Sequence, residues 1–595
     1  MLKEITKSLD KYLIVSNQRI FQNLNMGERV FIANRCQFSE YSKGDIVYSK
    51  GDERDYFNVL ISGRILLFDP KTEKQSKERP MDILLRGDYF GIISILTGRP
   101  HSLSARVIND TKILRIEQKA FKAILEKVPR LAVHFSKTLS RRLKRNYSGE
   151  KGIYESTILS VYYDGDEAYT SRYVNMLANS IVAESRKKVE VISIDKRPGQ
   201  KVSKGVSYRD ITSKEKDRIS AVLTGSARDH HFVIANMPSG LGRTGEQVLN
   251  QSDVCHIICD EDKEDVGRAE MLSNKIRQKS NNNIKIIVRE KSRAMNVVKN
   301  KPLKRSENIY MFLPCEAEKY NQVIKRISRE LSGIRIGLAL GSGGALGLAQ
   351  IGVLEAIEEN EIPIDALSGT SIGAIISSLW VSGYSAKEIQ DVCGSFGSKF
   401  RTISLVDITV PRMGFIGGKN IRKLLSKHLK DKTFNDTKIP LKIIACDINS
   451  RKEVVISSGK LIDAVMSSIA IPGIISPVIA DDGRILVDGG VVNPVPISVL
   501  VKDGIRRIIA VNSMPSPEDS EKIRRKKPTI FDIIVNSFYS MEYRIGKYSG
   551  EKADVYMHPI LKGAQWFEFY RAKEFVRFGK KEALKVLPDI KKLVK

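Results

Sequence analysis

The fold of the C-terminal part of the chain is decided by residues 336–347, which read IGLALGSGGALG, and by residues 369–373, which read GTSIG. Residues 336–340 are short and apolar, as in a buried parallel strand. The glycine cluster follows at once, where a strand must turn tightly into a helix. Residues without Cβ let backbone N–H groups converge on one point, so this turn predicts an anion cradle at a helix N-terminus.

The second stretch is Gly-x-Ser-x-Gly around Ser371, directly after the predicted strand 365–367. This pattern is typical of a nucleophile elbow, a strained strand-to-helix turn that exposes a serine hydroxyl. Either motif alone is also compatible with an ordinary turn. Together in one β-α-β unit they supply an oxyanion site and a nucleophile, the two parts that acyl transfer needs. The glycines of the two motifs are Gly341, Gly343, Gly344, Gly347, Gly369 and Gly373.

A third motif, Asp488-Gly489-Gly490, follows the predicted strand 485–487. An aspartate at a strand end beside two glycines is accessible to a neighbouring side chain. The alternative role, and the commoner one for Asp before Gly, is a turn or cap carboxylate.

These three motifs, in this order, resemble the patatin-like phospholipases over residues 334–505, and more loosely to the C-terminus. The resemblance implies an α/β hydrolase domain in which Ser371 is the nucleophile and Asp488 takes its proton directly. It also implies an oxyanion hole made by Ser342 and the backbone N–H groups of Gly343 and Gly344, with no metal or cofactor. The family carries Arg or Lys where Leu346 stands here, so the rate and the head-group choice stay open.

The N-terminal region, residues 31–116, has short strand-like runs separated by glycine turns, which predicts a small β-barrel. Its segments ISGR (61–64) and GDYFG (87–91) resemble the cyclic nucleotide-binding domain. That family places Glu and Arg where this chain has Ile92 and His101. An apolar side chain accepts no ribose hydrogen bond and histidine lacks a bidentate fork, so we expect no specific binding of cyclic AMP or cyclic GMP.

Residues 150–330 alternate apolar strands with helical runs, which predicts a Rossmann-like α/β sheet. The region weakly resembles the MinD/ParA class of P-loop proteins, but the Gly-Lys-Ser/Thr that holds nucleotide phosphates is absent. We therefore expect a degenerate P-loop domain with a structural or coupling role. The predicted strands are 158–163, 189–194, 231–235, 254–259 and 284–288.

Composition limits the partners and the location. The chain of 595 residues has 98 Lys and Arg against 69 Asp and Glu, a formal charge of +29. Such a surface favours anionic lipid or nucleic acid, but no nucleic-acid-binding motif is visible. A solvated lysine-rich surface is the plain alternative. No apolar run reaches the ~18 residues of a membrane span. The six cysteines are scattered, so we expect reduced thiols in a cytoplasmic protein that can attach peripherally to membranes.

We divide the multidomain α/β chain into a cyclic-nucleotide-binding-like domain (1–148), a Rossmann-like domain (149–330) and a patatin-like domain (331–595). This order resembles the neuropathy target esterase group of lysophospholipases. The expected function is hydrolysis of lipid carboxyl esters, by a lysophospholipase or phospholipase A whose substrate is a phospholipid or lysophospholipid. Two alternatives remain: a weak or inactive membrane-associated signalling scaffold, and an ordinary α/β-hydrolase with a Ser371-Asp488-His558 triad.

Overall fold

The computed structural model describes residues 11–594 apart from gaps, of which the longest are 71–78, 136–155, 195–203, 291–308, 395–413 and 520–529. Internal contacts divide the chain into two compact units. One unit is Val133–Ile334, and the other combines Met1–Ala132 with Arg335–Lys595. The three-domain division at 148/149 and 330/331 stays a prediction.

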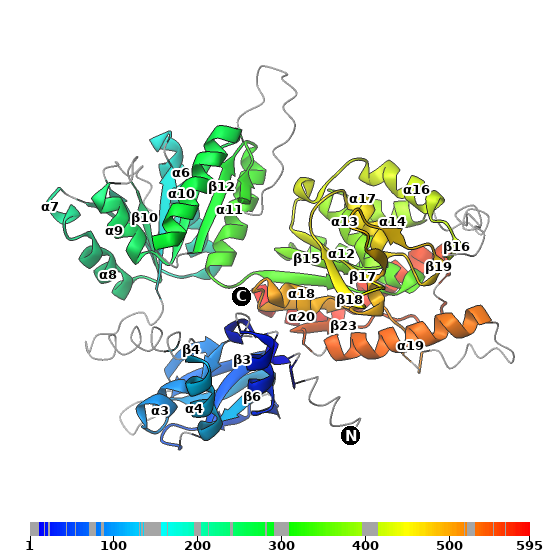
Figure 1. Cartoon of the computed structure of the whole chain (residues 1–595), viewed down its shortest axis with the longest axis horizontal. Helices are drawn as coiled ribbons and strands as arrows, with labels where there is room; N and C mark the ends of the chain where they lie inside the picture. Colours follow the sequence, from blue (N-terminus) through cyan, green and yellow to red (C-terminus); the bar gives the residue numbers. More distant parts are fainter. Residues whose placement is uncertain are drawn as a thin grey trace. The chain divides into compact units, whose positions relative to one another are not determined.

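Residues 36–117 form the predicted N-terminal β-barrel, with six antiparallel strands (Figure 1). The long strands β3 (Tyr56–Asp69) and β6 (Ser104–Glu117) pair along most of their length. Buried apolar side chains such as Leu60 and Ile113 fill the interior. The other elements are α2 (Met26–Ala33), β1 (Cys36–Tyr41), β2 (Ile46–Tyr48), β4 (Arg79–Leu84), β5 (Tyr89–Phe90), α3 (Ile92–Thr97) and α4 (Gln118–Lys127).

The unit Val133–Ile334 is a doubly wound sheet of seven parallel strands, as the alternating pattern predicts. Their order is β13-β12-β11-β7-β10-β8-β9. Helices α6 and α11 cover one face, and α8, α9 and α10 cover the other. The bounds are β7 (Thr157–Tyr163), α6 (Glu167–Ser185), β8 (Val189–Ile194), β9 (Val206–Ile211), α7 (Ser213–Lys216), α8 (Ile219–Asp229), β10 (Phe232–Asn236), α9 (Arg243–Gln251), β11 (Val254–Asp260), α10 (Lys263–Lys279), β12 (Asn283–Arg289), β13 (Ile309–Leu313) and α11 (Ala317–Leu331).

The C-terminal part is built on an eight-stranded mixed sheet in the order β20-β21-β17-β15-β14-β22-β23, with β18 beside β17. The central strand β14 (Ile336–Leu340) runs parallel to β15 (Ala366–Thr370) and to β22 (Arg507–Val511). The glycine loop and the Ser371 turn therefore follow the carboxyl ends of adjacent strands, and Asp488 on the antiparallel strand β21 pairs with Ala445 of β17, the strand next to β15. Its other strands and main helices are α12 (Ala349–Glu359), α13 (Ile372–Val381), α14 (Ala386–Gly394), α16 (Lys419–Leu429), β17 (Leu441–Asp447), β18 (Lys452–Ile456), α17 (Leu461–Ser468), β20 (Val478–Ile479), β21 (Ile485–Asp488), α18 (Ile497–Lys502), α19 (Ile530–Gly550), β23 (Val555–Met557) and α20 (Ala572–Val594).

Helices α12 and α20 cross with their main chains in contact. A Cβ added at Gly352 would lie 1.9 Å from the carbonyl oxygen of Val576, and one at Gly579 would lie 1.9 Å from that of Ala349. Any larger residue at either position would push the helices apart. Helix α20 thereby holds the helix that follows the glycine loop.

Candidate active site

The glycine loop joins β14 to the 3-10 helix η2 (Gly344–Leu348), which continues into α12. The N–H group of Gly341 donates to the carbonyl of Val511 (3.0 Å), and that of Ser342 donates to the carbonyl of Pro494 (2.8 Å). In the described hydrogen bonds, the N–H groups of Gly343 and Gly344 donate to no backbone carbonyl, because they stand at the start of η2. These two donors are the ones the sequence assigns to an oxyanion.

Ser371 stands between β15 and α13 in a strained backbone conformation, with φ 56° and ψ −124°. A non-glycine residue at positive φ persists only where the surroundings fix it. Here the Ser371 N–H donates to Oγ of Ser468 at 2.9 Å. A Cβ at Gly373 would lie 2.2 Å from the carbonyl oxygen of Leu340, so the elbow touches the end of β14. The geometry of a nucleophile elbow is present.

The remaining motif glycines also stand in close backbone contacts. A Cβ would come closer than 3.0 Å to a neighbouring heavy atom at Gly341, Gly343, Gly347, Gly369, Gly489 and Gly490.

Asp488 ends β21 and makes both of the contacts that its motif allows. Its Oδ2 accepts a hydrogen bond from Oγ of Ser371 at 2.6 Å, and its Oδ1 accepts one from the N–H of Gly490 at 2.8 Å. The second bond caps the short turn Gly489–Val491. The turn role and the side-chain partner role are therefore compatible, since each uses one carboxylate oxygen.

Burial dominates the electrostatics of this carboxylate. Asp488 is 1% exposed, and burial raises its pKa to about 7, against the lowering effect of the hydrogen bonds from Ser371 and Gly490. A carboxylate with a pKa near 7 is a far better proton acceptor than an ordinary aspartate, and it still titrates in the neutral range.

A second carboxyl group in this site, that of Glu542, was missed by the sequence analysis. Glu542 lies on α19, is 2% exposed, and reaches the turn of Gly490 beside the Ser342 hydroxyl. Burial, and then the charge of Asp488, raises the pKa of Glu542 well above its ordinary value. The raised pKa favours the protonated form of Glu542. The available signal was one acidic residue on the inward face of a helix, at helical spacing from Val535 and Gly546.

The structure also places two further positions that the sequence singled out, Leu346 and His558. Leu346 is 2% exposed and packs in the hydrophobic core. Nε2 of His558 lies 2.6 Å from the carbonyl oxygen of Met514. Among the described residues no histidine hydrogen bonds to Ser371 or Asp488, so the geometry gives no support to the triad alternative.

In the N-terminal barrel, Ile92 begins α3 and is 2% exposed. His101 is buried: its ring stacks on Tyr48 at 3.7 Å, and its Nδ1 is 3.0 Å from Oγ of Ser94. Burial also lowers the pKa of His101, which disfavours its cationic form. The two positions at issue are thus occupied by packed side chains. Gly87 of the motif lies outside the described residues.

In the described part of the chain, no cluster of three His, Cys, Asp or Glu residues suits a metal ion. No described helix is long and apolar enough to cross a membrane. All six cysteines are free thiols, and five of them are buried while Cys315 is exposed.

Two family models match the chain: patatin-like phospholipase at residues 338–501 and cyclic nucleotide-binding domain at residues 38–128. Among curated proteins, "Neuropathy target esterase sws" of Drosophila melanogaster is 23% identical over 80% of this chain and 36% of its own length. "Lysophospholipase NTE1" of Mycosarcoma maydis is 22% identical over 81% of this chain and 29% of its own length. "Patatin-like phospholipase domain-containing protein 6" of Mus musculus is 22% identical over 79% of this chain and 37% of its own length.

The chain thus spans well under half the length of these relatives. Among solved structures, the regulatory domain of Toxoplasma gondii PKA with cAMP is 17% identical, over 22% of this chain and 51% of that one, with a TM-score of 0.21. The family models agree with both resemblances read from the motifs. The chain carries a patatin-like phospholipase domain behind a cyclic nucleotide-binding domain.

Proposed function

We propose that the chain hydrolyses lipid carboxyl esters, as a lysophospholipase or phospholipase A that uses a Ser-Asp dyad. The observation that carries the proposal is the 2.6 Å hydrogen bond from the Ser371 hydroxyl to Asp488, at a strained turn that packs against the glycine loop. In that loop, the amides of Gly343 and Gly344 donate to no backbone carbonyl among the described residues. The names of the relatives, which include lysophospholipases, supply the substrate class.

In the first half-reaction Oγ of Ser371 attacks the acyl carbonyl while its proton moves to Oδ2 of Asp488. The N–H groups of Gly343 and Gly344 stabilise the oxyanion, and one such donor is typically worth ~3 kcal/mol. Collapse breaks the ester C–O bond, and the leaving alkoxide takes the proton from Asp488. Water then attacks the acyl-serine, gives its proton to Asp488, and releases the fatty acid as Ser371 regains a proton.

The substrate would be met at a membrane surface. Helix α19, which brings Glu542 to the site, exposes apolar side chains at Ile533, Ile534, Met541 and Tyr548. An amphipathic helix of this kind lies in the lipid interface, and the charge of +29 adds attraction to anionic lipid. The protein should bind anionic vesicles better than neutral ones and should be released by salt, since screening at 0.15 M acts over ~8 Å. Equal binding to both vesicles at every salt concentration would exclude this role.

The test of the activity is labelling of the purified chain by a fluorophosphonate, together with release of fatty acid from lysophosphatidylcholine. Wild type should be labelled at Ser371 and should hydrolyse the lipid, whereas Ser371→Ala should do neither. A folded wild-type protein that is neither labelled nor active would favour the scaffold alternative. Hydrolysis that persists in Ser371→Ala, free of contaminating esterase, would refute the assigned nucleophile.

A further inference from the structure

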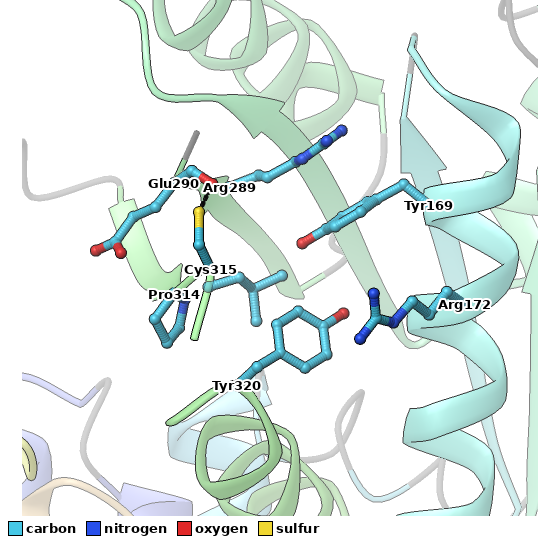
Figure 2. A pocket seen from close by; sticks show the side chains of 8 residues that line it. Tyr169, Arg172, Arg289, Glu290, Pro314, Cys315 and Tyr320 are labelled. Carbon is cyan, nitrogen blue, oxygen red and sulfur yellow. Dashed lines mark hydrogen bonds between the residues drawn. The ribbon is translucent and has the colours of Figure 1, made fainter. Parts of the chain in front are cut away.

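A cleft of about 200 Å³ opens in the unit Val133–Ile334, at the carboxyl edge of its parallel sheet (Figure 2). Its walls come from the first two turns of α6, the ends of β12 and β13, and the first turn of α11. Open α/β sheets bind ligands outside the carboxyl ends of their strands. The lining residues used below are Tyr169, Arg172, Arg289, Leu313, Cys315 and Tyr320.

The cleft holds a buried hydroxyl group, that of Tyr320. Tyr320 is 5% exposed, and its hydroxyl has no hydrogen-bond partner of normal geometry in the described part of the chain. Its nearest polar neighbour is the hydroxyl of Tyr169, and the charges of Arg172 and Arg289 also act on it. Because an unsatisfied buried hydroxyl is unfavourable, this one is suited to a ligand atom.

Two arginines line the cleft, Arg172 beside Tyr320 and Arg289 over Tyr169 (Figure 2). The guanidinium of Arg289 lies over the ring of Tyr169 at 4.2 Å and donates to the hydroxyl of Tyr163 at 3.2 Å, so its orientation is fixed. The guanidinium of Arg172 lies 5.7 Å from the ring centre of Tyr320 and has no carboxylate partner among the ion pairs of the described residues. Arg289, by contrast, also pairs with Asp260 at 3.9 Å. Preorganised guanidinium groups recognise phosphate and carboxylate oxygens.

The N-terminus of α11 adds backbone donors to this side of the cleft. Its N-cap residue Glu316 makes no capping hydrogen bond and pairs with Lys319 instead. By contrast, α6 is capped by Asp166, which accepts from the N–H of Ala168 at 2.9 Å. The first-turn amides of α11 are thus left without a side-chain acceptor, and a helix N-terminus favours an anion.

We infer that this cleft binds a small phosphate ester. The phosphate oxygens accept from Arg172, from the Tyr320 hydroxyl and from the first turn of α11, while the organic part packs on the Tyr169 ring and Leu313. The volume lies below the ~300–1,000 Å³ of sites for drug-sized ligands, which restricts the ligand to a small molecule or a single head group. This inference concerns a site in the other unit and does not rest on the esterase proposal.

The experiment uses the exposed thiol of Cys315 as a reporter in the full chain. The rate of its alkylation by iodoacetamide is measured by mass spectrometry with glycerol 3-phosphate, with glycerol plus chloride at equal ionic strength, and with vesicles of phosphatidic acid or of phosphatidylcholine. Glycerol 3-phosphate or phosphatidic acid vesicles should protect Cys315, and the two controls should not. Protection by the soluble ester assigns the ligand to free phosphate esters, and protection by the vesicles alone assigns it to lipid head groups.

The matched variants are Tyr320→Phe and Tyr208→Phe. Both remove a buried hydroxyl without a described hydrogen-bond partner, but Tyr208 lies on β9 and does not line the cleft. Neither variant should unfold the protein, because neither removes a hydrogen bond of normal geometry between described residues. Tyr320→Phe should weaken protection about tenfold, the loss expected for one bond to a charged group, and Tyr208→Phe should not change it. Absence of protection by every phosphate compound, or equal weakening in both variants, would overturn the inference.

Discussion

The carboxyl group of Glu542 occupies the space where a side chain at Gly490 would begin. A Cβ at Gly490 would lie 1.5 Å from Oε1 of Glu542 and 2.8 Å from Oγ of Ser342. Helix α19 therefore packs a buried acid directly on the turn that carries Asp488.

Gly490→Ala should displace Glu542 and damage the site. Overpacking of this kind typically costs ~1–3 kcal/mol, and the shifted turn should lower kcat as well. Gly394→Ala is the control, because a Cβ there meets no atom within 4 Å. Thermal unfolding and esterase assays should separate the two variants. If Gly490→Ala matches the control in both assays, the carboxyl of Glu542 does not fill this space.

Glu542→Gln tests whether the second acid is neutral. Glutamine reproduces the shape of the protonated carboxyl, so activity at pH 7 should stay within about threefold of wild type. At higher pH the variant should keep its activity where wild type loses it, because wild-type Glu542 would ionise beside Asp488. The measurement is the alkaline limb of the pH profile of kcat/KM. A large loss at pH 7 in folded Glu542→Gln would indicate that the ionised form is needed.

The pKa of Asp488, about 7, sets the acid limb. Asp488 must be deprotonated to accept the serine proton, so kcat/KM should fall about tenfold per pH unit below that value. The contribution of Asp488 to folding stability has the opposite pH dependence to its contribution to activity. Since the folded-state pKa is raised above its ordinary value of 3.8, the protonated form favours folding, and this contribution is lost as pH rises through about 7. Unfolding of Asp488→Asn should therefore depend less on pH than that of wild type. Full wild-type activity at pH 5 would contradict the raised pKa.

The dyad predicts a simple mutational pattern. Ser371→Ala and Asp488→Asn should each abolish hydrolysis, and the double variant should be no worse, because the two residues act as one unit. His558→Ala should keep most of the activity, since His558 contacts the Met514 carbonyl. A folded His558→Ala that lost several orders of magnitude in kcat would restore the triad alternative.

The N-terminal barrel should not bind cyclic nucleotides at micromolar concentration. A missing charge-assisted bond to phosphate is worth ~1.5–3 kcal/mol, and the unmade ribose bond adds to this loss. Isothermal titration of the full chain with cyclic AMP and cyclic GMP is the measurement. A micromolar dissociation constant for either nucleotide would show that the packed His101 rearranges to hold a phosphate.

Local signals were enough to single out Ser371, the glycine loop and Asp488, because each motif consists of adjacent residues, and Ser371 and Asp488 do meet in the structure. Their catalytic roles stay predictions. The five strands predicted in the middle region match β7, β8, β10, β11 and β12, which are buried. Edge strand β9 was missed because VSYRDI is half-exposed and carries charges. Glu542 was missed because only the tertiary fold brings a helix 52 residues downstream (542 − 490) onto the Gly490 turn.

The crossing of α12 and α20 at Gly352 and Gly579 affects how the C-terminal domain can be expressed alone. The family match ends at residue 501, yet α20 touches the main chain of α12. A fragment trimmed to the matched boundaries would lack α20. The face of α12 around Gly352 would then be exposed to water, on the helix that follows the glycine loop. Gene fragments designed for assay or crystallisation should therefore run through Val594.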